Sequence, residues 1–180
     1  RAMVDISAEE DYTSGVELNN DGSKIFIIGK TNDQVVEYNL SVAYDITTAS
    51  LGNTFSVNVE TGSPESFRFS LDGLMMYAVH LDMGANQSSI FTYSLSSAYD
   101  ISTATYAGPG ESLVLSFSDI RPLGLAFGGE SKMYLFGTND SGSPIREYDL
   151  EVAPDDVTPP VVTVDALITN VVSPELTGTI

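Results

Sequence analysis

The fold is decided by a phrase that the chain contains twice, "SVAYDITTAS" at Ser41–Ser50 and "SSAYDISTAT" at Ser96–Thr105. Its two tyrosines, Tyr44 and Tyr99, are 55 residues apart, and the match extends beyond the phrase on both sides. A motif that recurs at a fixed step is typical of a repeat architecture, whereas a single site needs only one copy. The phrase therefore predicts structural units that repeat along the chain.

Each unit has the pattern of four short antiparallel strands. One aromatic position recurs three times, as Phe26, Tyr77 and Tyr134, inside an almost entirely apolar strand. The preceding strand alternates apolar and polar residues, and a turn with Asp-Gly joins the two at Gly22 and Gly73. No stretch shows a sustained helical period. Four-stranded units that repeat every ~40–50 residues are typical of β-propeller blades.

These units divide the chain into an all-β propeller-like part and a tail. We expect about three four-stranded antiparallel blades, incomplete by themselves, followed by a C-terminal extended β tail. The boundaries are an outer strand at 1–12, blade one at 13–62, blade two at 63–120, blade three at 121–157, and a linker and tail at 158–180.

Blade three departs from the pattern, because Ala153–Asp156 ("APDD") stands where the other units have Ala-Tyr-Asp-Ile. We expect it to lack its outer strand, while Met3–Ser7 is a spare strand at the front of the chain. Three blades are fewer than the 4–8 of ordinary propellers. Closure could come from a second chain in a six-bladed ring, from further blades outside this sequence, or from an open head-to-tail chain.

Two resemblances accompany the repeats. The phrases "FSLDGLMMY" (Phe69–Tyr77) and "YSLSSAYDISTA" (Tyr93–Ala104) resemble YVTN-type propeller repeats of bacterial secreted and surface proteins, over residues 2–153. The tail phrases "TPPVVTVD" (Thr158–Asp165) and "PELTGT" (Pro174–Thr179) resemble the opening of immunoglobulin-like repeats of bacterial adhesins. The resemblances imply a propeller with an Ig-like segment, located outside the cell or on its surface.

The tail has two interpretations that the sequence leaves open. It is the start of a further Ig-like domain, or it is a donor strand that pairs with a neighbouring subunit. In the second case the apolar residues at both ends of the chain would mediate assembly. These candidate assembly residues are Met3, Val4, Ile6, Val161, Val162, Val164, Leu167 and Ile168.

Catalytic and nucleic-acid chemistry find little support in the sequence. There is no Cys and a single His, His80, which we interpret as structural because no thiol or Gly-x-Ser-x-Gly turn accompanies it. The recurrence of Asp45 and Asp100 predicts carboxylates that accept backbone N–H groups in a turn, and we expect Tyr44 and Tyr99 of the same phrase to pack between blades. A formal charge of -18 argues against nucleic acid as a partner, and no apolar run suits membrane insertion. We therefore expect no catalytic residues and no enzyme.

Calcium is the one cofactor for which the sequence offers candidate ligands. The weak candidate ligands are Asp140, Asp155 and Asp156, in loops rich in the oxygen atoms that Ca²⁺ prefers. None lies in a twelve-residue EF-hand loop, and no other cofactor is expected.

These observations predict a non-enzymatic extracellular protein that assembles with itself by strand exchange, as part of a surface filament or an adhesin. The alternative is the ligand-binding head of a large adhesin that recognises a glycan or a surface protein. A third hypothesis, a propeller enzyme, would need acidic residues around a central channel.

Overall fold

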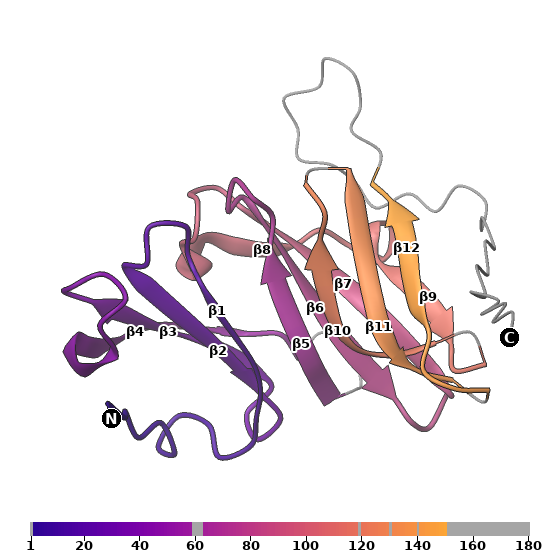
Figure 1. Ribbon diagram of the computed structural model, residues 1–180, viewed down its shortest axis with the longest axis horizontal. Coiled ribbons are helices and arrows are strands. Elements are labelled where there is room, and N and C mark those ends of the chain that lie inside the picture. Colours follow the sequence, from indigo (N-terminus) through magenta and orange to yellow (C-terminus); the bar gives the residue numbers. More distant parts are fainter. Residues whose placement is uncertain (1, 59–62, 119, 130, 140, 151–180) are drawn as a thin grey trace, which may run out of the picture.

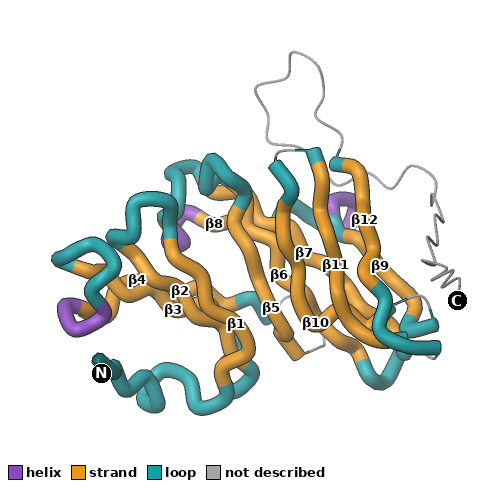
Figure 2. The backbone as a smooth tube through the Cα atoms, viewed as in Figure 1, coloured by secondary structure: helices purple, strands orange, loops and turns teal. Residues whose placement is uncertain are grey.

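Three antiparallel sheets follow one another along the chain, as the repeated strand and turn patterns predict (Figure 1). The computed structural model describes residues 2–150 except 59–62, 119, 130 and 140, and residues 1 and 151–180 lie outside the described part. Figure 2 shows that nearly all regular structure is strand, with short 3₁₀ turns between strands. The prediction of an all-β, incomplete propeller is confirmed.

Blade one is a sheet of four strands in sequential order. The alternating residues Val16 and Leu18 lie in the second half of the first strand, and the apolar run Ile25–Ile28 lies in the second strand. The strands are β1 (Thr13–Leu18), β2 (Lys24–Gly29), β3 (Gln34–Leu40) and β4 (Ala49–Ser56), with the 3₁₀ turn η1 (Ile46–Thr48) before β4.

Blade two has the same order, but its outer strand is in two pieces. Both pieces pair with the third strand, β8 at Tyr93–Leu95 and β9 at Gln87–Ile90. The sequence pattern indicated only the piece at Leu113–Phe117. The elements are β5 (Ser63–Phe69), β6 (Met75–Asp82), β7 (Gln87–Leu95), η2 (Ile101–Thr103), β8 (Ala104–Tyr106), η3 (Pro109–Glu111) and β9 (Leu113–Ser116).

Blade three consists of β10 (Arg121–Phe127), β11 (Lys132–Thr138) and β12 (Ile145–Asp149). Within the described residues this sheet has three strands and no outer strand. The helical elements of the described part are the three-residue turns η1, η2 and η3, and none of them approaches the length of a membrane-spanning helix.

Most of the core lies between neighbouring blades, and a smaller cluster of Ile27, Val36 and Tyr38 lies on the other side of blade one, where Ile6 packs on it. We call the side of a blade that faces the preceding blade its front face, and the side that faces the following blade its back face. The back face of blade one (Phe26, Ile28, Val35) packs on the front face of blade two, and the back face of blade two (Tyr77, Val79, Ile90) packs on that of blade three. The front-face residues that complete these two clusters are Met76, Ala78, Phe91 and Tyr93 in blade two, and Met133 and Leu135 in blade three.

Residues 2–12 contain no strand and lie beside blade one. Glu10 is buried there and its Oε1 accepts backbone N–H groups from Tyr12 and Thr31, at 3.0 and 2.8 Å. The other carboxylate oxygen accepts the N–H of Asn32 at 3.2 Å. This carboxylate therefore holds the segment at the end of β2. We expected residues 1–12 to form the outer strand of another blade. Because that pairing would involve a blade outside the described residues, it stays a prediction.

Candidate functional site

The first strands of the three blades, β1, β5 and β10, lie side by side (Figure 1). Each is an edge strand of its own sheet, so one side of its backbone has no partner strand in the described residues. In a propeller these inner edges face the central channel, where ligands reach the fold. The candidate site is the inner seam, the junction of β1 and β5 around Glu17 and Arg68.

Glu17 extends from β1 to the backbone of the next blade. Its Oε2 accepts the N–H of Phe69, at 3.0 Å, a contact between residues 52 positions apart. Burial raises the pKa of this carboxyl to about 7, although the hydrogen bond from Phe69 and the charge of Arg68 both favour the ionised form. A carboxyl with this pKa exchanges its proton near neutral pH.

Arg68 completes the seam from the opposite side. Its Nη1 donates to the carbonyl oxygens of Phe67 and Val16, at 3.2 and 3.3 Å. Glu17 and Arg68 therefore each bridge to the backbone of the neighbouring blade, in opposite directions. Charges interact more strongly in a partly buried seam than in water. Glu17 and Arg68 therefore join the two blades and also place two charged groups close together.

Tyr99 and Lys24 border the seam. The Tyr99 ring packs on Phe69, with centroids 5.2 Å apart, and burial followed by the charge of Glu17 raises the pKa of its hydroxyl. The ammonium of Lys24 donates to the Tyr99 carbonyl oxygen at 3.0 Å and to Glu37 at 3.1 Å. Tyr99 belongs to the repeated phrase, so the phrase supplies one wall of the seam.

The carboxylates of the repeated phrase have the structural role that their recurrence predicted. Asp45 accepts the N–H of Thr47 at 3.0 Å, and Asp100 accepts that of Ser102 at 3.1 Å. Each side chain caps a 3₁₀ turn, and hydrogen bonds to the residue two positions on lower the pKa of both carboxyls. The prediction that these carboxylates accept backbone N–H groups in a turn is confirmed.

The two tyrosines of the phrase differ in their surroundings. Tyr99 packs against the core between blades one and two, as we expected. Tyr44, expected to pack in the same way, is 67% exposed. The reason is topological: Tyr99 packs against the preceding blade, and within the described residues no blade precedes Tyr44.

His80 lies in the core of blade two. It packs edge-on against Phe91, with ring centroids 4.9 Å apart, and its buried Nε2 has no hydrogen-bond partner in the structure. Burial lowers the pKa of His80 to about 4, so the ring is neutral at physiological pH. This environment suits the structural role that we assigned to His80.

Metal ligation has no support among the described residues, which contain no group of three or more His, Asp or Glu side chains placed to hold an ion. The weak calcium candidates Asp140, Asp155 and Asp156 lie outside the described residues. The calcium hypothesis therefore stays a prediction.

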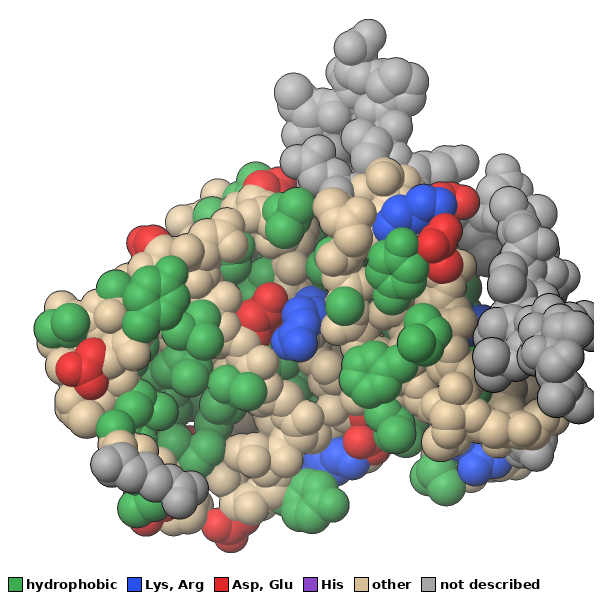
Figure 3. Space-filling model, in the orientation of Figure 1, with side chains coloured by type: hydrophobic (Ala, Val, Ile, Leu, Met, Phe, Trp, Pro, Cys, Tyr) green, Lys and Arg blue, Asp and Glu red, His purple; other side chains and the backbone are tan. Residues whose placement is uncertain are grey.

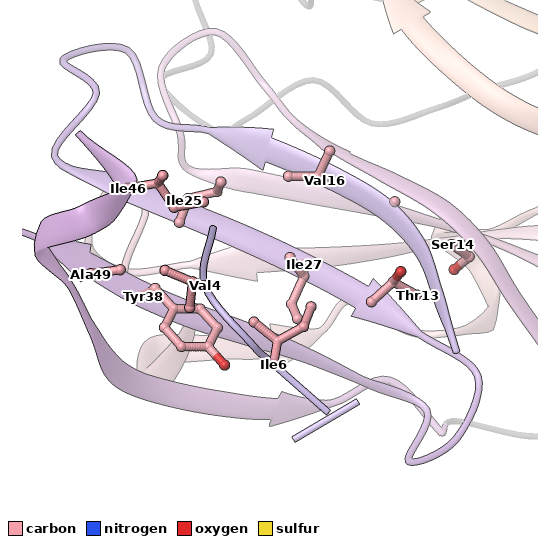
Figure 4. Close-up of a pocket in the computed structure, with 11 residues that line it drawn as sticks. Val4, Ile6, Thr13, Ser14, Val16, Ile25, Ile27, Tyr38, Ile46 and Ala49 are labelled. Carbon is pink, nitrogen blue, oxygen red and sulfur yellow. The ribbon is translucent and has the colours of Figure 1, made fainter. Parts of the chain in front are cut away.

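The candidate assembly residues at the front of the chain border a groove. Val4 and Ile6 line it together with the front face of blade one, whereas Met3 is 84% exposed. Figure 4 shows both side chains turned toward the sheet. The remaining candidates, at Val161, Val162, Val164, Leu167 and Ile168, lie outside the described residues. Their role in assembly stays a prediction.

Glu17 and Arg68 were not among the functional residues predicted from the sequence. Both lie next to the last residue of a strand whose apolar alternation is visible in the sequence, and a charged residue within such a strand was the available signal. Their pairing depends on two blades that meet only in the folded chain.

Comparisons with known proteins identify a fold and no family. No family model matches the sequence, and no curated protein matches it. A structure from Lactobacillus plantarum matches with a TM-score of 0.51 at 15% identity, over 76% of this chain and 37% of that one. A luciferin-regenerating enzyme matches with a TM-score of 0.49 at 18% identity, over 76% of this chain and 44% of that one.

A proposed 6-phosphogluconolactonase from Bacteroides uniformis matches with a TM-score of 0.47 at 12% identity, over 73% of this chain and 38% of that one. The chain therefore spans less than half the length of each of these three structures. Likeness at such identities shows a β-propeller-like fold alone.

The comparisons overturn the function predicted from sequence. We expected a non-enzymatic self-assembling or adhesin protein, whereas two of these structures are named as enzymes. That prediction, with its adhesin alternative and its exclusion of an enzyme, is wrong. The repeats specify an architecture, and one architecture supports unrelated activities, so function could not be read from them.

Proposed function

We propose that this chain is part of a β-propeller enzyme in which Glu17 acts as a general acid–base at the inner seam. The observation that supports the proposal is a carboxyl group with a pKa of about 7 on an inner strand. Proton transfer is most efficient when the pKa of the catalytic group lies near the working pH. Perturbed carboxyls of this kind cluster at functional sites.

The chemistry that fits these groups is hydrolysis of a carboxylic ester or lactone. Ionised Glu17 takes a proton from water as the water oxygen attacks the carbonyl carbon, and the carbonyl oxygen becomes negatively charged. When the ester bond breaks, protonated Glu17 returns the proton to the leaving oxygen. The guanidinium of Arg68 lies beside this carboxyl and stabilises negative charge that develops there.

A closed central channel is surrounded by about 4–8 blades, more than the three in this chain. The matching part of this chain covers only 37–44% of each similar structure, so we infer that further blades, from the same polypeptide or from a second copy, contribute the rest of the site. The seam then supplies the proton-transfer group, and the other blades supply the remaining substrate contacts.

Hydrolysis of a panel of lactones and esters, followed by proton release, tests the proposal in the longest natural polypeptide that contains this chain. We expect Glu17→Gln to lower kcat by about 100-fold or more, and the wild-type rate to change with a group of pKa near 7. Glu111→Gln, in the turn η3, is the matched control and should retain wild-type rates.

Two results would overturn the proposal. One is hydrolysis that is absent for the whole panel or unchanged in Glu17→Gln. The other is a carbon-detected titration of the Glu17 carboxyl with a pKa near its ordinary value of 4.5.

We also propose, from the sequence, a repeat family, a cellular location and an Ig-like tail for this protein. Kinship with YVTN-type repeats is supported by the motifs at Phe69–Tyr77 and Tyr93–Ala104. An extracellular or cell-surface location is supported by the acidic composition and that resemblance. The Ig-like character of the tail is supported by its "TPPVVTVD" phrase, which lies outside the described residues.

A further inference from the structure

The two interfaces between blades follow one rule: the back face of each blade packs on the front face of the next. Equivalent positions on the two back faces are Phe26 and Tyr77, and likewise Ile28 and Val79. The same repeat places Tyr134 and Phe136 at these positions in blade three, with Ile145 at the place of Val35. The back face of blade three therefore has the residues of a blade–blade interface.

That back face has no partner in the described part of the chain. Phe136 is 51% exposed and Ile145 is 75% exposed, whereas Ile28 and Val35 at the equivalent places are fully buried. Figure 3 shows apolar side chains at the surface over β10–β12.

Within the described residues no blade covers the front face of blade one, although Ile6 of the N-terminal segment packs on its buried residues Ile27, Val36 and Tyr38. This face forms a groove of about 430 Å³ around Ile25, Ile27 and Tyr38 (Figure 4). In Figure 3 apolar side chains surround a hollow over the strands of this blade. The groove and the exposed back face of blade three are the first and last faces of the three-blade stack.

Blade two shows what fills such a groove. The apolar residues that line it have one-to-one equivalents in the core between blades one and two. Ile6, at the groove wall, corresponds to Val57, which is buried in that core. The other equivalent pairs are Ile25 and Met76, Ile27 and Ala78, Tyr38 and Tyr93, Ile46 and Ile101, and Ala49 and Ala104. In blade two this surface receives Phe26, Ile28 and Val35, so the groove of blade one fits an equivalent apolar back face.

A polar contact identifies which back face fits. At the interface of blades one and two, Lys24 is held by Glu37 and donates to the carbonyl oxygen of Tyr99 in the repeated phrase. Blade three repeats the donor pair, with Lys132 bonded to Glu147 at 2.8 Å and also to Asp149.

Blade two has Met75 and Thr92 instead of the Lys–Glu pair, and the blade that follows it has lost the Ala-Tyr-Asp-Ile phrase. The pair is thus present in blade one, before a blade with an intact phrase, and absent in blade two, before the blade without it. Its return in blade three indicates that the next blade has an intact phrase. Blade one has that phrase, and its Tyr44 is exposed.

We propose that the back face of blade three packs into the front groove of blade one in a second copy of this chain. Phe136 and Ile145 fill the groove, and Lys132 donates to the Tyr44 carbonyl oxygen of the partner. Two such contacts close a ring of six blades, within the usual range of about 4–8. The contact joins complete sheet faces and needs no exchanged strand.

Sedimentation of the 180-residue chain between about 1 and 100 µM tests the proposal, with two exposed residues as probes. Ile145→Asp places a charge on the back face of blade three, and Val16→Asp places one at the groove. We expect the wild type to form dimers and each variant to dissociate at least about tenfold more readily. Lys132→Met, which introduces the residue of blade two, should weaken the dimer by a smaller factor.

Mixing the two variants distinguishes this interface from any other. The groove of Ile145→Asp and the back face of Val16→Asp are both intact, so the mixed dimer has one unaltered contact and should be tighter than the dimer of either variant alone. Val114→Asp, on the exposed side of β9, is the control and should dimerise like the wild type. A monomeric wild type at 100 µM, dimers of wild-type affinity in both variants, or a mixture no tighter than the separate variants would each overturn the proposal.

Discussion

Glu17 and His80 should make stability nearly independent of pH between 4.5 and 6.5, because their effects oppose each other there. The pKa of Glu17 is raised from 4.5 to about 7, so its contribution to stability is complete below pH 4.5 and is lost as the pH rises to about 7. The pKa of His80 is lowered from 6.5 to about 4, so its contribution is complete above pH 6.5 and is lost as the pH falls to about 4.

The size of each effect follows from the pKa shift. Each pH unit between the folded and unfolded pKa corresponds to about 1.4 kcal/mol, so each residue changes the free energy of unfolding by about 3 kcal/mol across its window. In the shared window the two slopes are equal in size and opposite in sign. The two slopes therefore cancel in the pH dependence of the wild-type free energy of unfolding.

Single substitutions should reveal each slope. In Glu17→Gln only the His80 term remains, so the free energy of unfolding should rise by about 3 kcal/mol between pH 4.5 and 6.5. In His80→Leu only the Glu17 term remains, and the free energy should fall by a similar amount. Urea unfolding at several pH values measures both, provided that the m-value stays constant.

The double variant is the control, since removal of both groups should restore a nearly flat profile. A Glu17→Gln profile that runs parallel to that of the wild type from pH 4.5 to 6.5 would contradict this prediction. That result would mean that burial in the seam does not raise the pKa of Glu17.

Two further predictions concern the turn and the N-terminal segment. Gly73→Ala should cost about 1–3 kcal/mol, since Gly73 has a φ of +73° and an added Cβ would lie 2.3 Å from the packed Tyr99 ring; Gly22→Ala should cost less, because the exposed Tyr44 ring can move away. Thermal unfolding compares the two, and equal losses would contradict this reasoning. Glu10→Ala should cost about 2–3 kcal/mol and speed hydrogen exchange at the N–H groups of Thr31 and Asn32, which would lose their acceptor. Unchanged exchange there would show that Glu10 does not hold the segment.

Much of the fold could be predicted from local patterns. The steps between Tyr38, Tyr93 and Tyr148, the apolar run at Ile25–Ile28 and the glycines at 22 and 73 placed strands and turns in three repeats. Such signals act within a few residues, since side-chain alternation and turn conformation depend on near neighbours. The two-piece outer strand of blade two was not predictable in this way, because β8 and β9 are defined by their pairing with different parts of β7.

The sequence by itself determined the repeat, the blade pattern and the loss of the Ala-Tyr-Asp-Ile phrase in the third unit. Only the tertiary structure decided that Glu17 is a group with a pKa near 7, that Tyr99 is packed while Tyr44 is exposed, and which blade faces stay uncovered. The reason is physical. The pKa of Glu17 depends on its burial against the next blade, on the charge of Arg68 and on the hydrogen bond from Phe69. Both residues belong to another blade, so no pattern within one strand predicts this pKa.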